Sequence, residues 1–189
     1  MGGSQMVLQR SVRPAKTRKK LIVRAISAAS KRGSLQFGPI HVPCALGRGG
    51  VKVLKREGDG ATPRGRYALR CVLYKPGMVT RPRTGLDLRA VRMTDGWCDS
   101  PSDRNYNRSV TLPYPRSAER LWRPDGIYDV IVVLGYNDVP RIRNRGSAVF
   151  MHVARVGFPP TDGCIALSQR DLRRLLGVVP RASEIVIEI

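Results

Sequence analysis

The chain has 189 residues, a length that suits one domain with a full hydrophobic core. Hydrophobic residues make up 42% of it and charged residues 25%, which excludes a chain that is disordered throughout. With 34 Lys and Arg against 14 Asp and Glu, the net charge is +20, which predicts an anionic partner such as nucleic acid, anionic lipid or an acidic cell-wall polymer. No apolar run reaches the roughly 18 residues that a bilayer span needs, so we expect no membrane span.

Positive charge is concentrated at the start of the chain. Residues 1–34 carry nine Lys or Arg and no acid, and the first acidic residue is Glu57. A basic arm that contacts a polyanion and a solvated tail are equally compatible with this pattern. The apolar stretch that follows "KTRKK" is too short and impure for a signal peptide, and residues 21–29 predict a first strand. We therefore divide the chain into a basic arm with a first strand, residues 1–34, and a domain over residues 35–189.

The next part of the chain predicts a β-meander. Short runs rich in apolar and β-branched residues are separated by glycine or proline, at residues 21–27, 35–46, 50–56 and 65–74. Residues 56–65, "REGDGATPRG", predict a tight loop between the last two runs.

Between residues 75 and 123 the apolar pattern weakens. Residues 95–110 are polar, aromatic and rich in turn formers, which predicts a loop that faces a substrate or, alternatively, a solvated connector. We expect apolar and hydrogen-bonding side chains of this region and its surroundings to line a substrate groove: Trp97, Asn105, Tyr106, Asn107 and Tyr136.

Strong patterns return in the last third of the chain. Residues 127–137 form an almost continuous apolar run, which predicts a strand buried on both faces, and residues 146–154 predict another. Ser168 and Asp171 resemble a capping box at the start of a short helix, and residues 183–189 predict a final strand. The predicted fold is mainly β with one or two short helices.

The four cysteines are Cys44, Cys71, Cys98 and Cys164, and no two of them form a CxxC pair. This spacing supports neither a zinc site nor a thioredoxin-type motif, and we expect no metal and no cofactor. One or two disulfides and free buried thiols are both compatible with the sequence.

His152 lies twelve residues before Cys164, and the interval contains Gly157 and two prolines. A cysteine becomes a good nucleophile only as the thiolate, so a histidine brought beside it could act as its base. Two separately buried residues are the alternative. Gly163 allows a tight turn, in which the amides of Gly163 and Cys164 could bind an oxyanion. Asp162 could orient the imidazole or cap the turn, and we favour the turn.

Two motifs together carry a family resemblance. "FMHVARVGFPPTDGCIAL" resembles the active-site signature of the L,D-transpeptidases with a YkuD-like catalytic domain, in which a histidine precedes a Ser/Thr-x-Gly-Cys segment. "KREGDGATPRGRYAL" resembles the upstream glycine-rich Thr-Pro-x-Gly loop of that family, seen here as Gly58, Thr62, Pro63 and Gly65. The two motifs frame roughly residues 35–189, and the resemblance implies a YkuD-like β-sandwich or barrel over that range.

The resemblance also implies a cysteine enzyme of peptidoglycan. Cys164 would be the nucleophile that forms a thioester with a diaminopimelate-containing stem peptide, and His152 would be the general base. The thioester would pass to an amine, giving a cross-link, or to water. The short Thr-Asp-Gly-Cys motif is similar to an alpha- and betaproteobacterial branch thought to join L-Ala to diaminopimelate in a 1,3 cross-link. Peptidoglycan stem peptides would be the partners, the periplasm or cell envelope the location, and a monomer the expected state.

The chain departs from the family pattern at two positions. Asp162 stands where the family usually has a second histidine, and Ala166 stands where it usually has an arginine. Arg155 could replace that arginine and hold a carboxylate of diaminopimelate, because a guanidinium binds a carboxylate through two parallel hydrogen bonds. A surface arginine without a function is the alternative.

Two other functions remain open at the level of sequence. An L,D-carboxypeptidase, an endopeptidase or another thiol amidase of the cell wall would use the same thiol on a different bond. A non-catalytic nucleic-acid-binding protein would account for the charge of +20, but no nucleic-acid-binding motif accompanies that charge.

Overall fold

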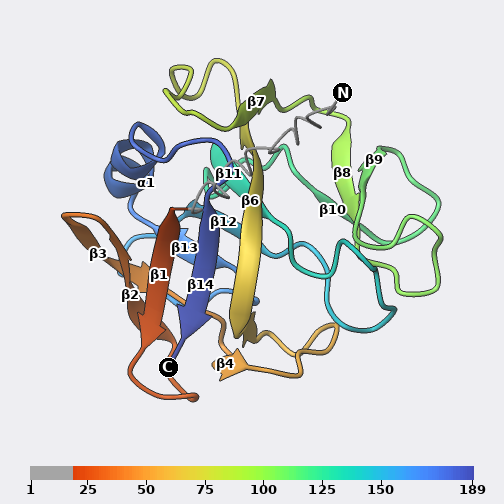
Figure 1. The fold of residues 1–189 in the computed structure, drawn as a ribbon. Helices are drawn as coiled ribbons and strands as arrows, with labels where there is room; N and C mark the ends of the chain where they lie inside the picture. Colours follow the sequence, from red (N-terminus) through yellow and green to blue (C-terminus); the bar gives the residue numbers. More distant parts are fainter. Residues whose placement is uncertain (1–18) are drawn as a thin grey trace, which may run out of the picture.

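A computed structural model describes residues 19–189 of the chain. The strands of its main sheet are β1 (Lys20–Ala25), β2 (Arg32–Phe37), β3 (Ile40–Ala45), β6 (Gly65–Tyr74), β7 (Asp87–Ala90), β11 (Val130–Leu134), β12 (Phe150–Val153), β13 (Ile165–Leu167) and β14 (Glu184–Glu188). Their order is β11-β12-β13-β3-β2-β1-β14-β6-β7, and a pairing between β11 and β6 closes all of them except β7 into a barrel (Figure 1). The predicted mainly β fold is confirmed.

Strand β11 separates two apolar cores. Side chains alternate along a strand, so Val130 and Val132 belong to the core inside the barrel, whereas Ile131 and Val133 belong to a second cluster on the outer face. Every residue of β11 is buried, as the continuous apolar run predicts. The outer cluster exists because the chain between residues 91 and 128 returns over this face of the barrel.

Most strands of the predicted meander are present, but only β1, β2 and β3 pair in succession, whereas β6 pairs with β14, β7 and β11. β6 has the predicted bounds of residues 65–74, and the run at residues 35–46 lies in a hairpin that turns at Gly38 between β2 and β3. The run at residues 50–56 was expected to be a strand, but only β4 (Val51–Lys52) forms, paired with β5 (Thr62–Pro63). The strand ends there because the chain turns: the side chains of Val53 and Leu54 point into solvent.

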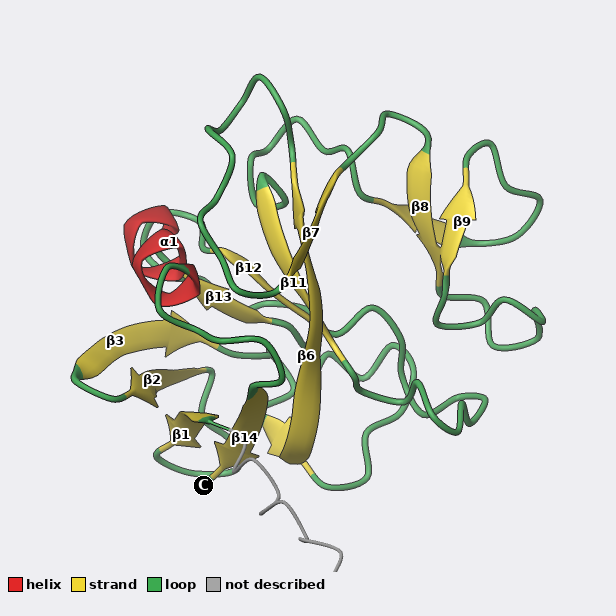
Figure 2. Ribbon diagram, turned by 45° about the horizontal axis from the view of Figure 1, so that its top comes forward, coloured by secondary structure: helices red, strands yellow, loops and turns green. Residues whose placement is uncertain are grey.

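The predicted loop at residues 95–110 is partly wrong. β8 (Asp95–Cys98) and β9 (Ser109–Thr111) pair with each other, and β10 (Ala118–Arg120) completes a small sheet in the order β10-β8-β9 (Figure 2). Although its sequence is mostly polar, this small sheet packs against the barrel. The indole of Trp97 contacts the ring of Phe150 edge to face, with centroids 5.2 Å apart. This sheet covers the outer face of the barrel rather than forming a flexible connector.

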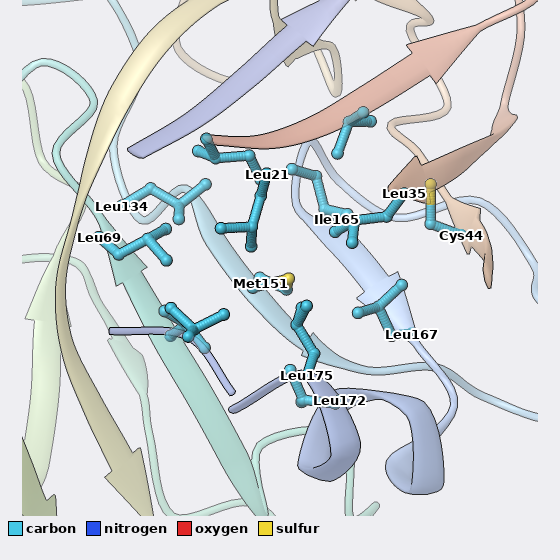
Figure 3. Close-up of a cluster of buried hydrophobic side chains, with 14 of the residues drawn as sticks. Leu21, Leu35, Cys44, Leu69, Leu134, Met151, Ile165, Leu167, Leu172 and Leu175 are labelled. Atoms are coloured by element: carbon cyan, nitrogen blue, oxygen red, sulfur yellow. The ribbon is translucent and has the colours of Figure 1, made fainter. Parts of the chain in front are cut away.

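The predicted helix is present as α1 (Gln169–Leu176). Ser168 is its N-cap, and its hydroxyl accepts a hydrogen bond from the Asp171 amide at 3.1 Å. Three leucines spaced for one helical face, Leu172, Leu175 and Leu176, are fully buried. Figure 3 shows Leu172 and Leu175 directed from the helix toward the strands, where they pack in the barrel core.

The predicted first strand is present as β1, which pairs with β14 in parallel and with β2 in antiparallel orientation. β2 runs across the predicted boundary between residues 34 and 35, so the described part of the N-terminal segment belongs to the barrel. Residues 1–18 of the predicted basic arm lie outside the described residues. Among residues 19–189, the structure contains no helix long and apolar enough to cross a membrane.

Candidate active site

His152 lies on β12, and Cys164 immediately precedes the neighbouring strand β13. β12 and β13 run parallel, with Met151 opposite Ile165 and His152 opposite Ala166, so Cys164 lies level with Phe150. Because Met151 and Ile165 point into the barrel, the alternation of side chains sends His152 and Cys164 to the outer face. Both line one cavity of about 500 Å³ there. The fold thus brings together the two residues on which the predicted dyad depends.

The Cys164 thiol is buried, with 8% of the residue exposed. Its sulfur accepts a hydrogen bond from the Phe150 amide and donates one to the Ala148 carbonyl, each at 3.3 Å. Burial raises the pKa of this thiol to about 12, so it is protonated at neutral pH. Within residues 19–189 these two backbone groups are its hydrogen-bond partners, and in this resting arrangement His152 is not one of them.

The His152 imidazole is also buried, with 5% exposed. Its Nδ1–H donates to the Val153 carbonyl at 2.9 Å, which leaves Nε2 as the unprotonated nitrogen. Burial lowers the pKa of this imidazole to about 4, so it is neutral at pH 7 and able to accept a proton. The ring of Tyr128 packs against it edge to face, with centroids 5.3 Å apart, and the Tyr128 hydroxyl donates to Glu119 at 2.6 Å.

This burial predicts a pH-dependent stability. His152 has a lower pKa in the folded protein, about 4, than the ordinary value of 6.5, so its contribution is full above pH 6.5 and is lost as the pH falls toward 4. The shift corresponds to about 3 kcal/mol. We expect the stability advantage of the wild type over His152→Gln to shrink by about this amount between pH 7 and pH 4 in urea unfolding.

The control for this measurement is His41→Gln, because His41 is the other histidine of the chain and its side chain is exposed on β3. Its unfolding free energy should follow that of the wild type at every pH. A His152→Gln profile parallel to the wild type would contradict the buried neutral imidazole.

The turn before Cys164 is held by Thr161. The Thr161 hydroxyl donates to the Cys164 carbonyl at 2.6 Å and accepts from the Gly163 amide at 3.2 Å. The predicted oxyanion donor at Gly163 is therefore engaged in the resting protein. Asp162 is exposed and pairs with Arg48, at 2.7 Å between Oδ1 and Nε, rather than with His152.

Arg155 lines the same cavity, as the sequence prediction requires. It shares the carboxylate of Asp125 with Arg123, and each guanidinium approaches Asp125 Oδ2 to 2.8 Å. Hydrogen bonds from these two arginines lower the pKa of Asp125 to about 2. Arg123 also lies 3.9 Å from a carboxylate oxygen of Glu119, so the two guanidinium groups face two carboxylates. The cavity walls carry other charges of both signs: Arg48, Lys55, Arg120, Glu57, Asp99, Glu119 and Asp162.

The other predicted groove residues do not line the cavity of Cys164. Four of them line a second cavity that shares no residue with the first: Trp97, Asn105, Asn107 and Tyr136. The Tyr106 hydroxyl is buried against Glu57, to which it donates.

Asn107 holds the backbone next to the site through hydrogen bonds. Its Oδ1 accepts from the Trp97 indole at 2.9 Å and from the Ala148 amide at 3.1 Å, and the carbonyl of Ala148 accepts from the Cys164 thiol. Ala148 has a φ of 51°, a conformation that a residue with a side chain adopts only when its surroundings hold it there. Asn107 is one of the groups that do so.

Sequence reasoning did not identify Lys55. Its side chain is 3% exposed, and its Nζ donates to Asp59 Oδ1 at 2.9 Å. It lines the cavity of Cys164, where its charge acts to lower the pKa of the thiol against the larger effect of burial. Its Nζ lies near the turn at Gly163, which is far away in the sequence. An isolated lysine in the sequence gives no signal of such a long-range contact.

No curated protein matches the chain in sequence. Three solved structures resemble its fold. Bd1075 of Bdellovibrio bacteriovorus is 13% identical, with a TM-score of 0.46, over 92% of this chain and 49% of that one. An L,D-transpeptidase from Mycobacterium smegmatis is 13% identical, with a TM-score of 0.44, over 91% and 59%. L,D-transpeptidase 3 from Mycobacterium tuberculosis is 14% identical, with a TM-score of 0.45, over 89% and 60%.

The chain thus spans between 49% and 60% of the length of these three structures. The model of the YkuD family, described as the L,D-transpeptidase catalytic domain, matches residues 31–187. This match covers most of the chain, including both motifs on which the sequence resemblance rests. The chain therefore belongs to the family of L,D-transpeptidases with a YkuD catalytic domain.

Proposed function

We propose that the protein is a peptidoglycan L,D-transpeptidase in which Cys164 is the nucleophile and His152 the general base. The observation that carries this proposal is the placement of both side chains on the same face of two paired strands and in one cavity. The imidazole supports the role because its Nδ1–H is fixed on the Val153 carbonyl and its Nε2 is free to accept a proton.

The proposed reaction starts from a neutral pair. The thiol leaves the Ala148 carbonyl and gives its proton to Nε2 of His152 as sulfur attacks the carbonyl carbon of the stem peptide. The imidazolium then returns the proton to the departing amine as the C–N bond breaks, which leaves a thioester on Cys164. An acceptor amine attacks this thioester and loses a proton to His152, the C–S bond breaks, and the sulfur is reprotonated.

The cavity suits a substrate that carries both a carboxylate and an amine, as diaminopimelate does. Arg155 and Arg123 present guanidinium groups for the carboxylate. Asp99 lines the same cavity, and its carboxylate could accept hydrogen bonds from an ammonium group. The amide of Cys164 would hold the oxyanion, joined by that of Gly163 if it leaves Thr161.

With this function, the enzyme would act in the periplasm or cell envelope, where its substrate lies. The proposed product is a cross-link, of the 1,3 type if the acceptor is the amine of L-Ala. Transfer to water at the same thioester would instead make the protein an L,D-carboxypeptidase or endopeptidase.

Purified disaccharide-tetrapeptides, mixed with the free tetrapeptide L-Ala-D-Glu-diaminopimelate-D-Ala, test the proposal, because the free tetrapeptide offers the unacylated L-Ala amine that a 1,3 cross-link requires. We expect dimers with loss of the terminal D-residue, detected by liquid chromatography and tandem mass spectrometry, and fragmentation locates the new bond. His152→Gln should lower the rate by about 10²- to 10⁴-fold, the usual contribution of a general base. Shortened stems without dimers would establish hydrolysis in place of transfer, and the absence of any product would refute the proposal.

A further inference from the structure

A second cavity, of about 650 Å³, opens beside the small sheet and shares no lining residue with the cavity of Cys164. Four of its lining residues are arginines that come from separate parts of the chain: Arg70, Arg89, Arg108 and Arg141. Their convergence is produced by the fold, because Arg70 lies on β6, Arg89 on β7 and the other two in loops.

The charges of these arginines are only partly neutralised. Arg70 pairs with Asp138 at 2.6 Å, and Arg89 pairs with Asp95 at 2.8 Å. Arg108 and Arg141, by contrast, have no carboxylate within 4.0 Å among residues 19–189.

Arg141 is held at the cavity by a long contact from its Nε to the Asn107 carbonyl, at 3.4 Å. Desolvation, followed by the like charge of Arg108, lowers the pKa of Arg141, and the carboxylate of Asp138, which pairs with Arg70, only partly opposes this shift. Two neighbouring guanidinium groups that repel each other favour an anion between them.

Apolar residues form another part of the wall. Leu73 and Val133 are buried side chains of β6 and β11, and the indole of Trp97 is half-buried beside them. An apolar surface surrounded by guanidinium groups is suited to a ligand with an apolar backbone and several carboxylates. A bare inorganic anion would leave the apolar part unused.

We propose that this cavity binds the free carboxylates of a stem peptide other than the one that reacts at Cys164. The proposal rests on the proposed function for the identity of the peptide, since stem peptides are the carboxylate-rich component of the polymer. It differs from that function in its site: Arg108 and Arg141 bind the carboxylates and take no part in bond breaking.

The second cavity is close to the reacting thiol through the chain of contacts already described. The Trp97 indole donates to Asn107, whose Oδ1 also accepts from the Ala148 amide, and the Ala148 carbonyl accepts from the thiol. A peptide bound in the second cavity would therefore keep the polymer beside the catalytic cavity. Such binding raises the local concentration of stem peptides at Cys164.

The test uses the indole N–H of Trp97 as a local reporter. The chain has two tryptophans, and the other, Trp122, packs against Lys75 away from this cavity. The full chain with Cys164→Ala is titrated with the tetrapeptide L-Ala-D-Glu-diaminopimelate-D-Ala, and the indole resonances are followed by NMR. We expect a saturable shift of the Trp97 resonance, a tenfold or greater loss of affinity in Arg108→Ala/Arg141→Ala, and no shift with the fully amidated peptide.

The matched control is Arg64→Ala/Arg170→Ala, which removes two exposed arginines outside both cavities and should leave the affinity unchanged. An unshifted Trp97 resonance, or equal affinity in the Arg108/Arg141 variant and its control, would overturn the proposal. Tighter binding of an oligothymidine, lost in the same variant, would also overturn it by assigning the cavity to nucleic acid. Because the titration needs no turnover, its result is independent of whether the product assay succeeds.

Discussion

Cys164→Ala is expected to abolish turnover of disaccharide-tetrapeptides, with a loss of at least about 10⁴-fold in rate. The reason is that no other described side chain in the cavity is a thiol, and the sulfur is the group that would form the thioester. The variant should still fold, because it removes one buried sulfur and two long hydrogen bonds at a cost of about 1 kcal/mol. The measurements are product formation by mass spectrometry and thermal unfolding by circular dichroism.

Cys44→Ala is the matched control for this prediction. Cys44 is also a free, buried thiol whose pKa is raised by burial to about 12, but it lies in the barrel core on β3. Its loss should lower stability by a comparable amount and leave the rate of turnover unchanged. Dimer formation by Cys164→Ala at a rate near that of the wild type would rule out Cys164 as the nucleophile.

Gly163→Ala is expected to lower the free energy of unfolding by about 3 kcal/mol and kcat/KM by about a hundredfold. Gly163 has a φ of +125°, and a Cβ added there would lie 2.7 Å from the Ala61 carbonyl oxygen and 3.4 Å from Lys55 Nζ. The backbone oxygen cannot yield easily, so the turn that carries Cys164 must move. Urea unfolding and steady-state kinetics measure the two effects.

Gly157→Ala separates backbone strain from the steric conflict. Gly157 lies in the same loop with a φ of +79°, and nothing lies within 4 Å of an added Cβ. It should cost about 1 kcal/mol of stability and leave kcat/KM close to that of the wild type. Equal effects of the two substitutions would show that close packing under Gly163 does not position Cys164.

The sequence predicted the strands and the helix that local patterns define: a helix cap, an alternation of apolar residues, or a continuous apolar run in a strand buried on both faces. β6 has its predicted bounds, α1 has the predicted cap at Ser168, and β11 is buried on both faces as its apolar run requires. The small sheet of β8, β9 and β10 was not predicted, because its strands are short and polar. They are stabilised by packing against the barrel through residues such as Trp97.

The residues of the candidate site also fall into those that a local motif predicted and those that it did not. The pair of His152 and Cys164 follows from a motif of eighteen consecutive residues, so local sequence was sufficient to propose it. Lys55, Tyr128 and Glu119 reach the same cavity from distant parts of the chain, and no local signal marks them. Asn107 is the opposite case. The sequence predicted it to line the substrate groove, but its side chain instead holds the Trp97 indole and the Ala148 backbone outside the cavity of Cys164.

By itself, the sequence determined the mainly β class, the positions of most principal strands along the chain, the helix and the pair of residues proposed for the chemistry. It could do so because alternation of apolar side chains, helix capping and a short motif are properties of neighbouring residues. Only the tertiary structure decided which charges face Cys164, how the thiol and imidazole are protonated, and where Arg108 and Arg141 converge. Those features depend on burial and on distances between segments far apart in the chain, which packing alone sets.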